Sequence, residues 1–251
     1  MEILNNPSDI EVSVISVVYN DAPGIKVALE SAVLQKDINF EIIVIDGGST
    51  DGTASVARGI LENFKNSTVV SEKDNGIYNA INKGIKIAHG KYVLMLNAGD
   101  WFYDDFALSF LLKEAENGNK NYALGRCKYY YPQKDEKLED SPFLPASGAP
   151  ELSHQALLYR KSLHDKIGYY DEKMKSAADY AFFCKLKFRT GLDFVKKDRF
   201  IVVRGKYGND ASEKLTHTIE MAYIDIRYGL IFKTWPKRAK SIIARAFKTL
   251  K

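Results

Sequence analysis

Residues 12–18 read VSVISVV and residues 41–46 read EIIVID, two short runs of apolar and β-branched side chains. Runs of this length and composition are typical of strands that are buried on both faces. Between them, Asn20, Asp21 and Pro23 are helix-start residues, and a helical pattern continues to Gln35. A strand, a helix and a second strand in this order predict a right-handed crossover between parallel strands.

The alternation of strand and helix patterns continues to residue 96. We expect a helix over Gly52–Phe64, a strand at Ser67–Ser71, a helix over Ile77–Ala88 with Gly90 as its left-handed C-cap, and a strand at Lys91–Leu96. This order predicts an α/β fold with a mainly parallel sheet and helices on both faces.

The second half of the chain is less regular. We expect strands at Ala123–Tyr130 and Gln155–Tyr159, a loop over residues 131–150, and a helix over Ala177–Thr190 that ends at Gly191. The pattern is helical past Asp210. We therefore predict a main domain over residues 1–210 and a C-terminal helical extension over residues 211–251.

The composition excludes several classes of protein. With 251 residues and 45% hydrophobic content the chain can bury one substantial core, and it has no repeat of fixed period. Its two cysteines, Cys127 and Cys184, form neither a metal-type cluster nor a disulfide framework, which favours a reducing cytoplasm. Residues 1–9 lack a secretory signal pattern and the apolar runs are short, so we expect no segment that crosses a membrane.

Four polar clusters follow the four strands predicted in the first half. They are Tyr19–Asp21, Asp46–Asp51, Glu72–Asn75 and Asn97–Asp100. Ligands of parallel sheets bind beyond the carboxyl ends of the strands, so we expect these clusters to share one cleft. The dinucleotide fingerprint, the phosphate loop, metal-type histidine spacing and a nucleophile elbow are all absent from the sequence, which disfavours NAD-dependent, P-loop and hydrolase functions.

The ordered set of segments Val14–Asn20, Val44–Thr53, Ser71–Gly84 and Leu96–Asp100 resembles the nucleotide-binding half of family 2 glycosyltransferases with the GT-A fold, a Rossmann-like sheet. Within the family the likeness is to the exopolysaccharide branch that includes the colanic acid biosynthesis enzymes. It extends through Ser153–Ala156 and Ala177–Tyr180 and covers about residues 12–210. The resemblance implies an inverting sugar transfer from a nucleotide-sugar donor, with a UDP-sugar first among the candidates.

For the donor, the resemblance implies that Tyr19, Asn20 and Asp46 hold the nucleoside, with Asp46 contacting the base or ribose. Asp46 can instead be a turn-capping residue in its Gly-rich loop. The resemblance also places Glu72 and Lys83 in the donor pocket, where Lys83 can pair with phosphate. Both can equally be solvated charges.

Asn97–Asp100 stand at the family's metal motif, which implies that Asn97 lies at the donor and that Asp100 binds a divalent cation, Mn²⁺ or Mg²⁺. A hard cation stabilises the charge that develops on the departing diphosphate. Asn and Gly replace the family's frequent Asp here, and the alternative is a plain β-turn.

For the acceptor, the resemblance implies that Asp179 is the catalytic base and that His154 lies near the acceptor. The alternative for Asp179 is a first-turn residue that interacts with the helix dipole. Lys206 belongs to a segment, Lys206–Asp210, that resembles the loop closing over donor phosphates in the family.

The C-terminal segment is strongly basic. Seven basic residues and no acidic one lie in residues 233–251, whereas residues 1–232 carry a net charge of −3. Apolar residues recur among these cations at helical spacing, a pattern typical of helices that bind anionic membrane surfaces. An oligomer or core helix is the alternative, and a nucleic-acid partner is not expected.

Together these features predict a glycosyltransferase that is cytoplasmic and peripheral at the inner face of the plasma membrane. Its acceptor is expected to be a lipid-linked saccharide or an oligosaccharide in surface polysaccharide biosynthesis, and a homo-oligomer is possible. A nucleotidyltransferase and a non-catalytic nucleotide-sugar-binding subunit are the rival hypotheses.

Overall fold

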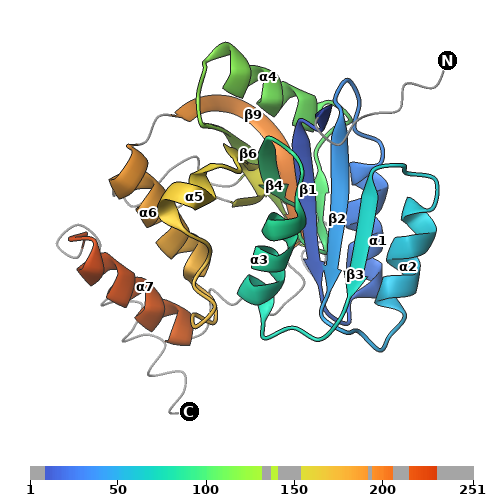
Figure 1. The fold of residues 1–251 in the computed structure, drawn as a ribbon, viewed down its shortest axis with the longest axis horizontal. Coiled ribbons are helices and arrows are strands. Elements are labelled where there is room, and N and C mark those ends of the chain that lie inside the picture. The colour runs from blue at the N-terminus through green and yellow to red at the C-terminus, as the bar shows by residue number, and fades with distance from the viewer. Residues whose placement is uncertain (1–8, 132–136, 141–153, 192–193, 206–214, 231–251) are drawn as a thin grey trace.

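The computed structural model describes residues 9–131, 137–140, 154–191, 194–205 and 215–230 (Figure 1). The strands are β1 Val12–Val18, β2 Phe40–Asp46, β3 Ser67–Ser71, β4 Tyr92–Met95, β5 Asp100–Phe102, β6 Tyr122–Tyr131, β7 Lys137–Asp140, β8 Leu157–Arg160 and β9 Phe194–Gly205. The helices are α1 Ala22–Ala32, α2 Thr53–Leu61, α3 Ile77–Ile87, α4 Ala107–Asn117, α5 Leu163–Ile167, α6 Ala178–Thr190 and α7 Leu215–Arg227, with a 3₁₀ turn at His154–Ala156.

One sheet contains all of these strands, in the order β3-β2-β1-β4-β8-β6-β9-β5, with β7 paired to β6. Strands β1 to β4 are parallel to one another, whereas β8 runs antiparallel to both β4 and β6. In the parallel part, Asp46 at the end of β2 is in register with Val18 of β1 and Ser71 of β3. The exits of these three strands therefore lie side by side.

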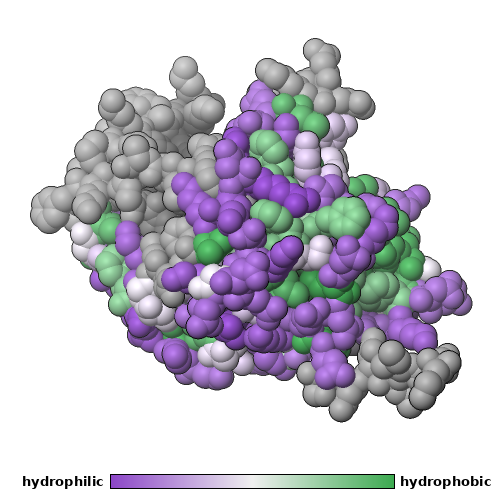
Figure 2. All heavy atoms as spheres, turned by 90° about the horizontal axis from the view of Figure 1, so that it is seen from above, coloured by the Kyte–Doolittle hydropathy of each residue, from purple (hydrophilic) through white to green (hydrophobic). Residues whose placement is uncertain are grey.

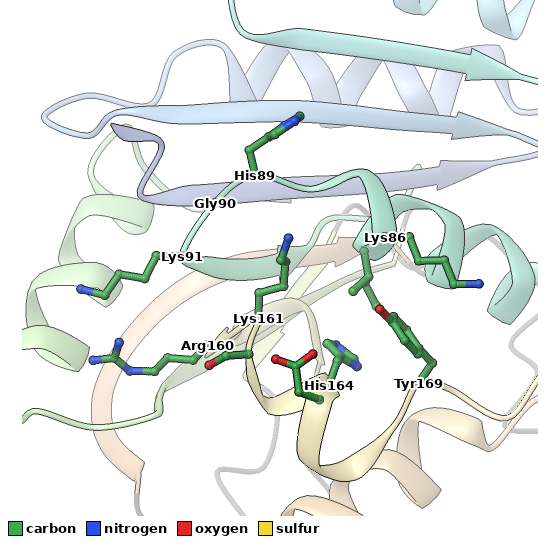
Figure 3. Close-up of a pocket in the computed structure, with 11 residues that line it drawn as sticks. Lys86, His89, Gly90, Lys91, Arg160, Lys161, His164 and Tyr169 are labelled. Carbon is green, nitrogen blue, oxygen red and sulfur yellow. The ribbon is translucent and has the colours of Figure 1, made fainter. Parts of the chain in front are cut away.

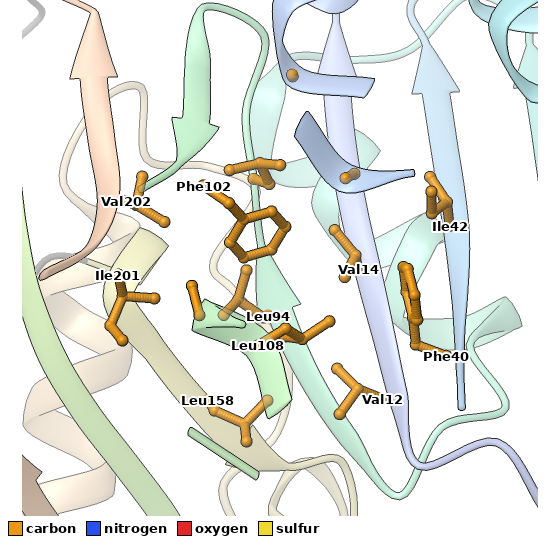
Figure 4. Packing of buried hydrophobic residues seen from close by; sticks show 14 of the residues in the cluster. Val12, Val14, Phe40, Ile42, Leu94, Phe102, Leu108, Leu158, Ile201 and Val202 are labelled. Atoms are coloured by element: carbon orange, nitrogen blue, oxygen red, sulfur yellow. The ribbon is translucent and has the colours of Figure 1, made fainter. Parts of the chain in front are cut away.

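Helices cover the sheet on both faces, and the alternation of side chains along β1 shows why. Val12 and Val14 point into a core with α1, α2 and α4, part of which Figure 4 shows. Ile15 and Val17 point to the other face and pack with α3, α5 and α6. This arrangement confirms the predicted α/β fold with helices on both faces, although the second half of the sheet is mixed rather than parallel.

Several elements differ from the sequence-based prediction. β5, α4, α5 and β9 were not predicted, and β7 lies within the stretch expected to be a loop. His154–Ala156, expected in part as a strand, form a 3₁₀ turn before β8. Short strands in a mixed sheet depend on partners that are distant in sequence, so local periodicity does not reveal them.

Gly90 is not the predicted left-handed C-cap of α3. The helix ends at Ile87, its C-cap residue Ala88 has extended backbone angles, and Gly90 is absent from the described glycines with positive φ. A Cβ atom on Gly90 would lie 2.4 Å from the Ser13 amide nitrogen. The residue is therefore required by the close approach of the two backbones.

The C-terminal part that the structure describes is helical, as predicted, and lies against α6 (Figure 1). Met221 and Ile224 of α7 pack with Tyr180, Ala181 and Cys184 of α6. Within the described ranges, no helix has both the length and the apolar character needed to cross a bilayer. Seen from above, the described surface is mainly hydrophilic with smaller apolar areas among the polar residues (Figure 2).

Candidate functional site

Asp46, at the end of β2, is completely buried. Its carboxylate accepts hydrogen bonds from the Ser71 hydroxyl at 2.6 Å, from the Ser49 amide at 3.1 Å and from the Ser49 hydroxyl. These donors satisfy the buried charge and tie the exits of β2 and β3 together. The contacts correspond to the loop-capping interpretation of Asp46, and they place the carboxylate beneath the loop surface.

Asn20 links the exits of β1 and β2. Its side-chain Oδ1 accepts a hydrogen bond from the Thr50 backbone amide at 2.8 Å, and its backbone amide donates to the Ser49 hydroxyl oxygen at 2.7 Å. Asn20 has a φ of 48°, a left-handed value that asparagine tolerates better than most residues. Neighbouring Tyr19 keeps 64% of its surface exposed.

Gly47 is the point at which three strand exits meet. A Cβ atom on Gly47 would lie 2.6 Å from the Asp74 carboxylate and 3.3 Å from the Tyr19 ring. The side chains of Tyr19, which follows β1, and Asp74, which follows β3, therefore both lie close to the backbone of Gly47. Beside Gly47, the exposed Tyr19 ring therefore offers an aromatic face, and the Asp74 carboxylate offers a hydrogen-bond acceptor.

Glu72 and Lys83 pair with each other. The Lys83 Nζ lies 2.6 Å from the Glu72 carboxylate and donates to the Lys73 carbonyl at 3.3 Å. Both side chains are partly exposed, so the pair contributes little to stability. A phosphate that binds Lys83 would compete with Glu72 for its charge.

His154 bridges two of the predicted site residues, Asn97 and Asp179. Its Nε2 lies 3.2 Å from the Asn97 side-chain nitrogen, and its Nδ1 lies 3.4 Å from the Asp179 carboxylate. These two contacts orient the imidazole ring, with Nε2 toward Asn97 and Nδ1 toward Asp179. The Asn97 Oδ1 is buried and has no hydrogen-bond partner among the described residues.

Asp179 begins α6, and its electrostatic surroundings keep it ionised. Burial raises the pKa of Asp179, but the hydrogen bond and charge of His154 and the Tyr180 amide outweigh burial and leave the pKa below its usual value. The carboxylate is still 30% exposed. It is therefore a charged acceptor that a substrate hydroxyl can reach.

Asp100 lies close enough to His154 to interact with it electrostatically. Burial raises the pKa of Asp100, although the charges of Arg204 and His154 oppose the shift. Its carboxylate accepts the Gly205 amide at 3.2 Å and a hydrogen bond from the Gln155 side chain. Arg204 did not emerge from the sequence, because β9 was not predicted. Gln155 belongs to the segment Ser153–Ala156 that carries the resemblance, but no role was predicted for it.

The structure thus gathers the predicted residues into separate groups. Asn97, Asp100, His154 and Asp179 lie together, whereas Tyr19, Asn20 and Asp46 cluster around the β1 and β2 exits. Glu72 and Lys83 form the pair at the β3 exit. Lys206 lies outside the described residues.

A divalent cation has two candidate ligand atoms here. The unpartnered Oδ1 of Asn97 and the carboxylate of Asp100 are oxygens, the ligands that Mg²⁺ and Mn²⁺ prefer. In the part of the chain that the structure describes, no group of three or more His, Cys, Asp or Glu side chains can hold a metal. The residues therefore fit a cation that takes its other ligands from substrate phosphates and water.

A hollow of about 410 Å³ lies at the opposite edge of the sheet, where β4 begins (Figure 3). Its cationic side chains diverge, with Lys91 and Arg160 pointing to one side and Lys86 to the other. It contains none of the predicted site residues. We place the candidate active site at the strand exits, because most of the predicted site residues lie there, although in separate groups.

Comparison with known proteins identifies the family of the chain. The family model described as glycosyl transferase family 2 matches residues 13–193. The chain is 28% identical over 183 residues to a PGL/p-HBAD biosynthesis glycosyltransferase of Mycobacterium bovis, covering 68% of this chain and 67% of that protein. It is 40% identical over 111 residues to an uncharacterized glycosyltransferase of Rickettsia felis, covering 44% of this chain and 18% of that protein. The chain belongs to glycosyl transferase family 2 and is a glycosyltransferase.

Solved structures show the same fold at lower identity. S. aureus TarS residues 1–349 in complex with UDP-GlcNAc match with a TM-score of 0.68 at 21% identity, covering 86% of this chain and 66% of that one. A mannosyltransferase from Pyrobaculum calidifontis in complex with GDP-Man and Mn²⁺ matches with a TM-score of 0.67 at 18% identity, covering 96% and 76%. These likenesses establish a GT-A glycosyltransferase fold for the chain.

Proposed function

We propose that the protein transfers a sugar from a nucleotide sugar, with a UDP-sugar as the first candidate, to an acceptor hydroxyl with inversion, and that Asp179 is the catalytic base. The observation that carries the proposal is the row Asn97, His154 and Asp179, with Asp100 beside it. It joins the exit of β4 to the start of α6. Donor and acceptor chemistry would therefore meet at His154.

Asp179 would take the proton of the acceptor hydroxyl as that oxygen attacks the anomeric carbon. Its lowered pKa keeps it ionised at neutral pH, so it is ready to accept. His154 holds the carboxylate through Nδ1 and leaves part of it exposed. The nucleoside diphosphate leaves from the opposite face of the sugar, which inverts the configuration.

The donor would lie along the strand exits. Tyr19 can stack on the base, and Asp74 or, after a rearrangement of its loop, Asp46 can accept hydrogen bonds from the nucleoside. Asn20 holds the loop between them, and Lys83, released from Glu72, and Lys206 would pair with phosphate. A divalent cation held by Asp100 and Asn97 would supply charge stabilisation to the leaving diphosphate.

The acceptor and the cellular location of the protein are inferred from the sequence. We infer a lipid-linked saccharide acceptor, a place in the exopolysaccharide branch, and attachment of residues 233–251 to the inner face of the plasma membrane. The motif resemblance and the basic, amphipathic pattern of those residues support these inferences. We also retain the division into a main domain over residues 1–210 and an extension over residues 211–251.

Substitution of Asp179 tests the proposal. In Asp179→Asn, donor binding should persist while transfer falls by about 10²- to 10⁴-fold, the usual contribution of a general base. Thermal shifts with UDP-glucose, UDP-galactose, UDP-GlcNAc and GDP-mannose, with and without Mn²⁺, measure binding. Release of nucleoside diphosphate measures turnover, with water as the acceptor where none is known.

Asp165→Asn is the matched control, because Asp165 is an exposed carboxylate at the hollow on the opposite edge. It should leave both readouts unchanged. Wild-type turnover in Asp179→Asn would remove Asp179 from the mechanism. Pyrophosphate release by the wild type would favour a nucleotidyltransferase, and donor binding without any turnover would favour a non-catalytic subunit.

A further inference from the structure

The backbone amides that lead into α6 have their hydrogen-bond partners on other helices. Ala177 is the N-cap residue of α6 and has no side chain that can cap the helix. The Tyr78 hydroxyl of α3 contacts the amides of Ala178 and Asp179. The position of Asp179 therefore depends on groups outside α6.

Glu220 of α7 supplies the largest share of these contacts. Its two carboxylate oxygens accept the amides of Lys175 at 2.8 Å, Ser176 at 3.0 Å and Ala177 at 3.0 Å. The Ser176 hydroxyl donates to the same carboxylate at 3.2 Å. Charge-assisted bonds of this kind are stronger than neutral ones, and three consecutive amides fix the path of the backbone.

Other contacts lock α7 against this segment. His217 Nδ1 donates to the Ser176 carbonyl at 3.0 Å, and the Tyr180 hydroxyl donates to Asp225 at 2.5 Å. Met221 and Ile224 pack on Tyr180. Polar contacts on both sides of an apolar seam hold α7 in one register relative to α6.

We propose that Glu220 is a positioning residue of the glycosyl transfer. By accepting hydrogen bonds from the amides of residues 175–177, Glu220 keeps the Asp179 carboxylate next to His154 and oriented toward the acceptor. The inference rests on the proposed function, because it requires Asp179 to be the base. The family model matches residues 13–193, and α7 follows them. Through Glu220, α7 would therefore contribute to the reaction.

Glu220→Gln is the decisive variant, because it keeps the size of the side chain but turns one acceptor oxygen into a donor. We expect kcat for nucleoside diphosphate release to fall by about 10- to 100-fold, as misplacing a catalytic group by about 1 Å does. KM and thermal shift for the best UDP-sugar should stay at wild-type values, because the proposed donor groups lie at the exits of β1 to β4 and on α3, and none lies on α6 or α7.

A double-variant cycle separates positioning from a general structural effect. In the Asp179→Asn background, adding Glu220→Gln should cause no further loss, because the group that Glu220 positions is already disabled. Glu30→Gln is the control, because Glu30 is exposed on α1 and contacts Lys26 at 3.8 Å. It should leave kcat and KM unchanged.

Wild-type kcat in Glu220→Gln, or an equal fold-loss in both backgrounds, would overturn the inference. If Glu220→Gln fails to fold, His217→Ala takes its place, since it removes the other polar contact to Ser176. A fall in its kcat at constant KM would support the inference, and unchanged kcat would overturn it. Full turnover in Asp179→Asn would instead overturn the proposed base itself.

Discussion

His154 contacts an amide on one side and a carboxylate on the other, and this pairing sets the orientation of its ring. Nε2 faces the Asn97 amide and Nδ1 faces Asp179. Asp179 is thereby held in place by a side chain from a distant part of the sequence. A single side chain thus orients Asp179, the proposed base, and connects it to the segment Asn97–Asp100.

His164 predicts how stability depends on pH. It is 3% exposed, its Nδ1 donates to the Gly168 carbonyl, and its Nε2 accepts from the Tyr159 hydroxyl. Burial lowers the pKa of His164 to about 4 from 6.5. As pH falls below 6.5 the unfolded chain protonates first, so stability should decline by about 3 kcal/mol by pH 4.

Urea unfolding of the wild type and His164→Gln at pH 7, 5.5 and 4.5 measures this contribution. The variant should be less stable at pH 7, because it loses ring contacts, but its stability should fall less steeply between pH 6.5 and 4. Carboxylates titrate alike in both proteins and cancel in the comparison. Parallel pH profiles would show that His164 does not titrate in this range.

Among the helices, α3 shows how closely an element must approach the sheet. A Cβ atom on Gly84 would lie 2.5 Å from Cγ2 of Ile15 in β1. Ile15 is β-branched and completely buried, so it has little room to move. Glycine lowers the stability of a helix, but at position 84 it allows α3 to pack closely against β1.

Two glycine substitutions in helix interiors test this account. Gly84→Ala should destabilise the protein by about 1–3 kcal/mol, because the added methyl overpacks the core. Gly59→Ala in α2 meets nothing within 4 Å and should stabilise the protein by about 0.5–1 kcal/mol through helix propensity. Denaturant midpoints measure both changes. A gain in stability for Gly84→Ala would contradict the packing explanation.

For the molecule as a whole, the uneven distribution of charge predicts a membrane contact. Seven basic residues occupy residues 233–251, while the rest of the chain is slightly acidic. Each cation near an anionic leaflet adds about 1 kcal/mol of attraction. Deleting residues 233–251 should abolish sedimentation with phosphatidylglycerol vesicles but leave nucleoside diphosphate release intact, because the proposed site lies in the main domain.

A full-length variant with Lys237, Arg238 and Lys240 changed to Gln is the control for chain length. It should bind the same vesicles more weakly, and binding of the wild type should decline with salt. Undiminished sedimentation of the truncated protein at moderate salt would show that residues 233–251 are not the anchor.

The sequence allowed the first half of the fold to be predicted with small shifts at the ends of elements. β1 and β3 have the expected bounds, because runs such as VSVISVV are apolar on both faces. β5, α4, β7, α5 and β9 were missed. In particular, β9 pairs with β6 and β5, and such long-range pairing leaves little periodic signal.

Local periodicity and turn residues were sufficient to indicate an α/β sheet and to place polar residues at its strand exits, because burial patterns and backbone preferences act over a few residues. They could not reveal that His154 lies between Asn97 and Asp179, that Arg204 lies near Asp100, or that Glu220 grips the amides before α6. Those contacts join distant parts of the chain. They exist because the packing of the mixed sheet and of α7 brings their backbones together.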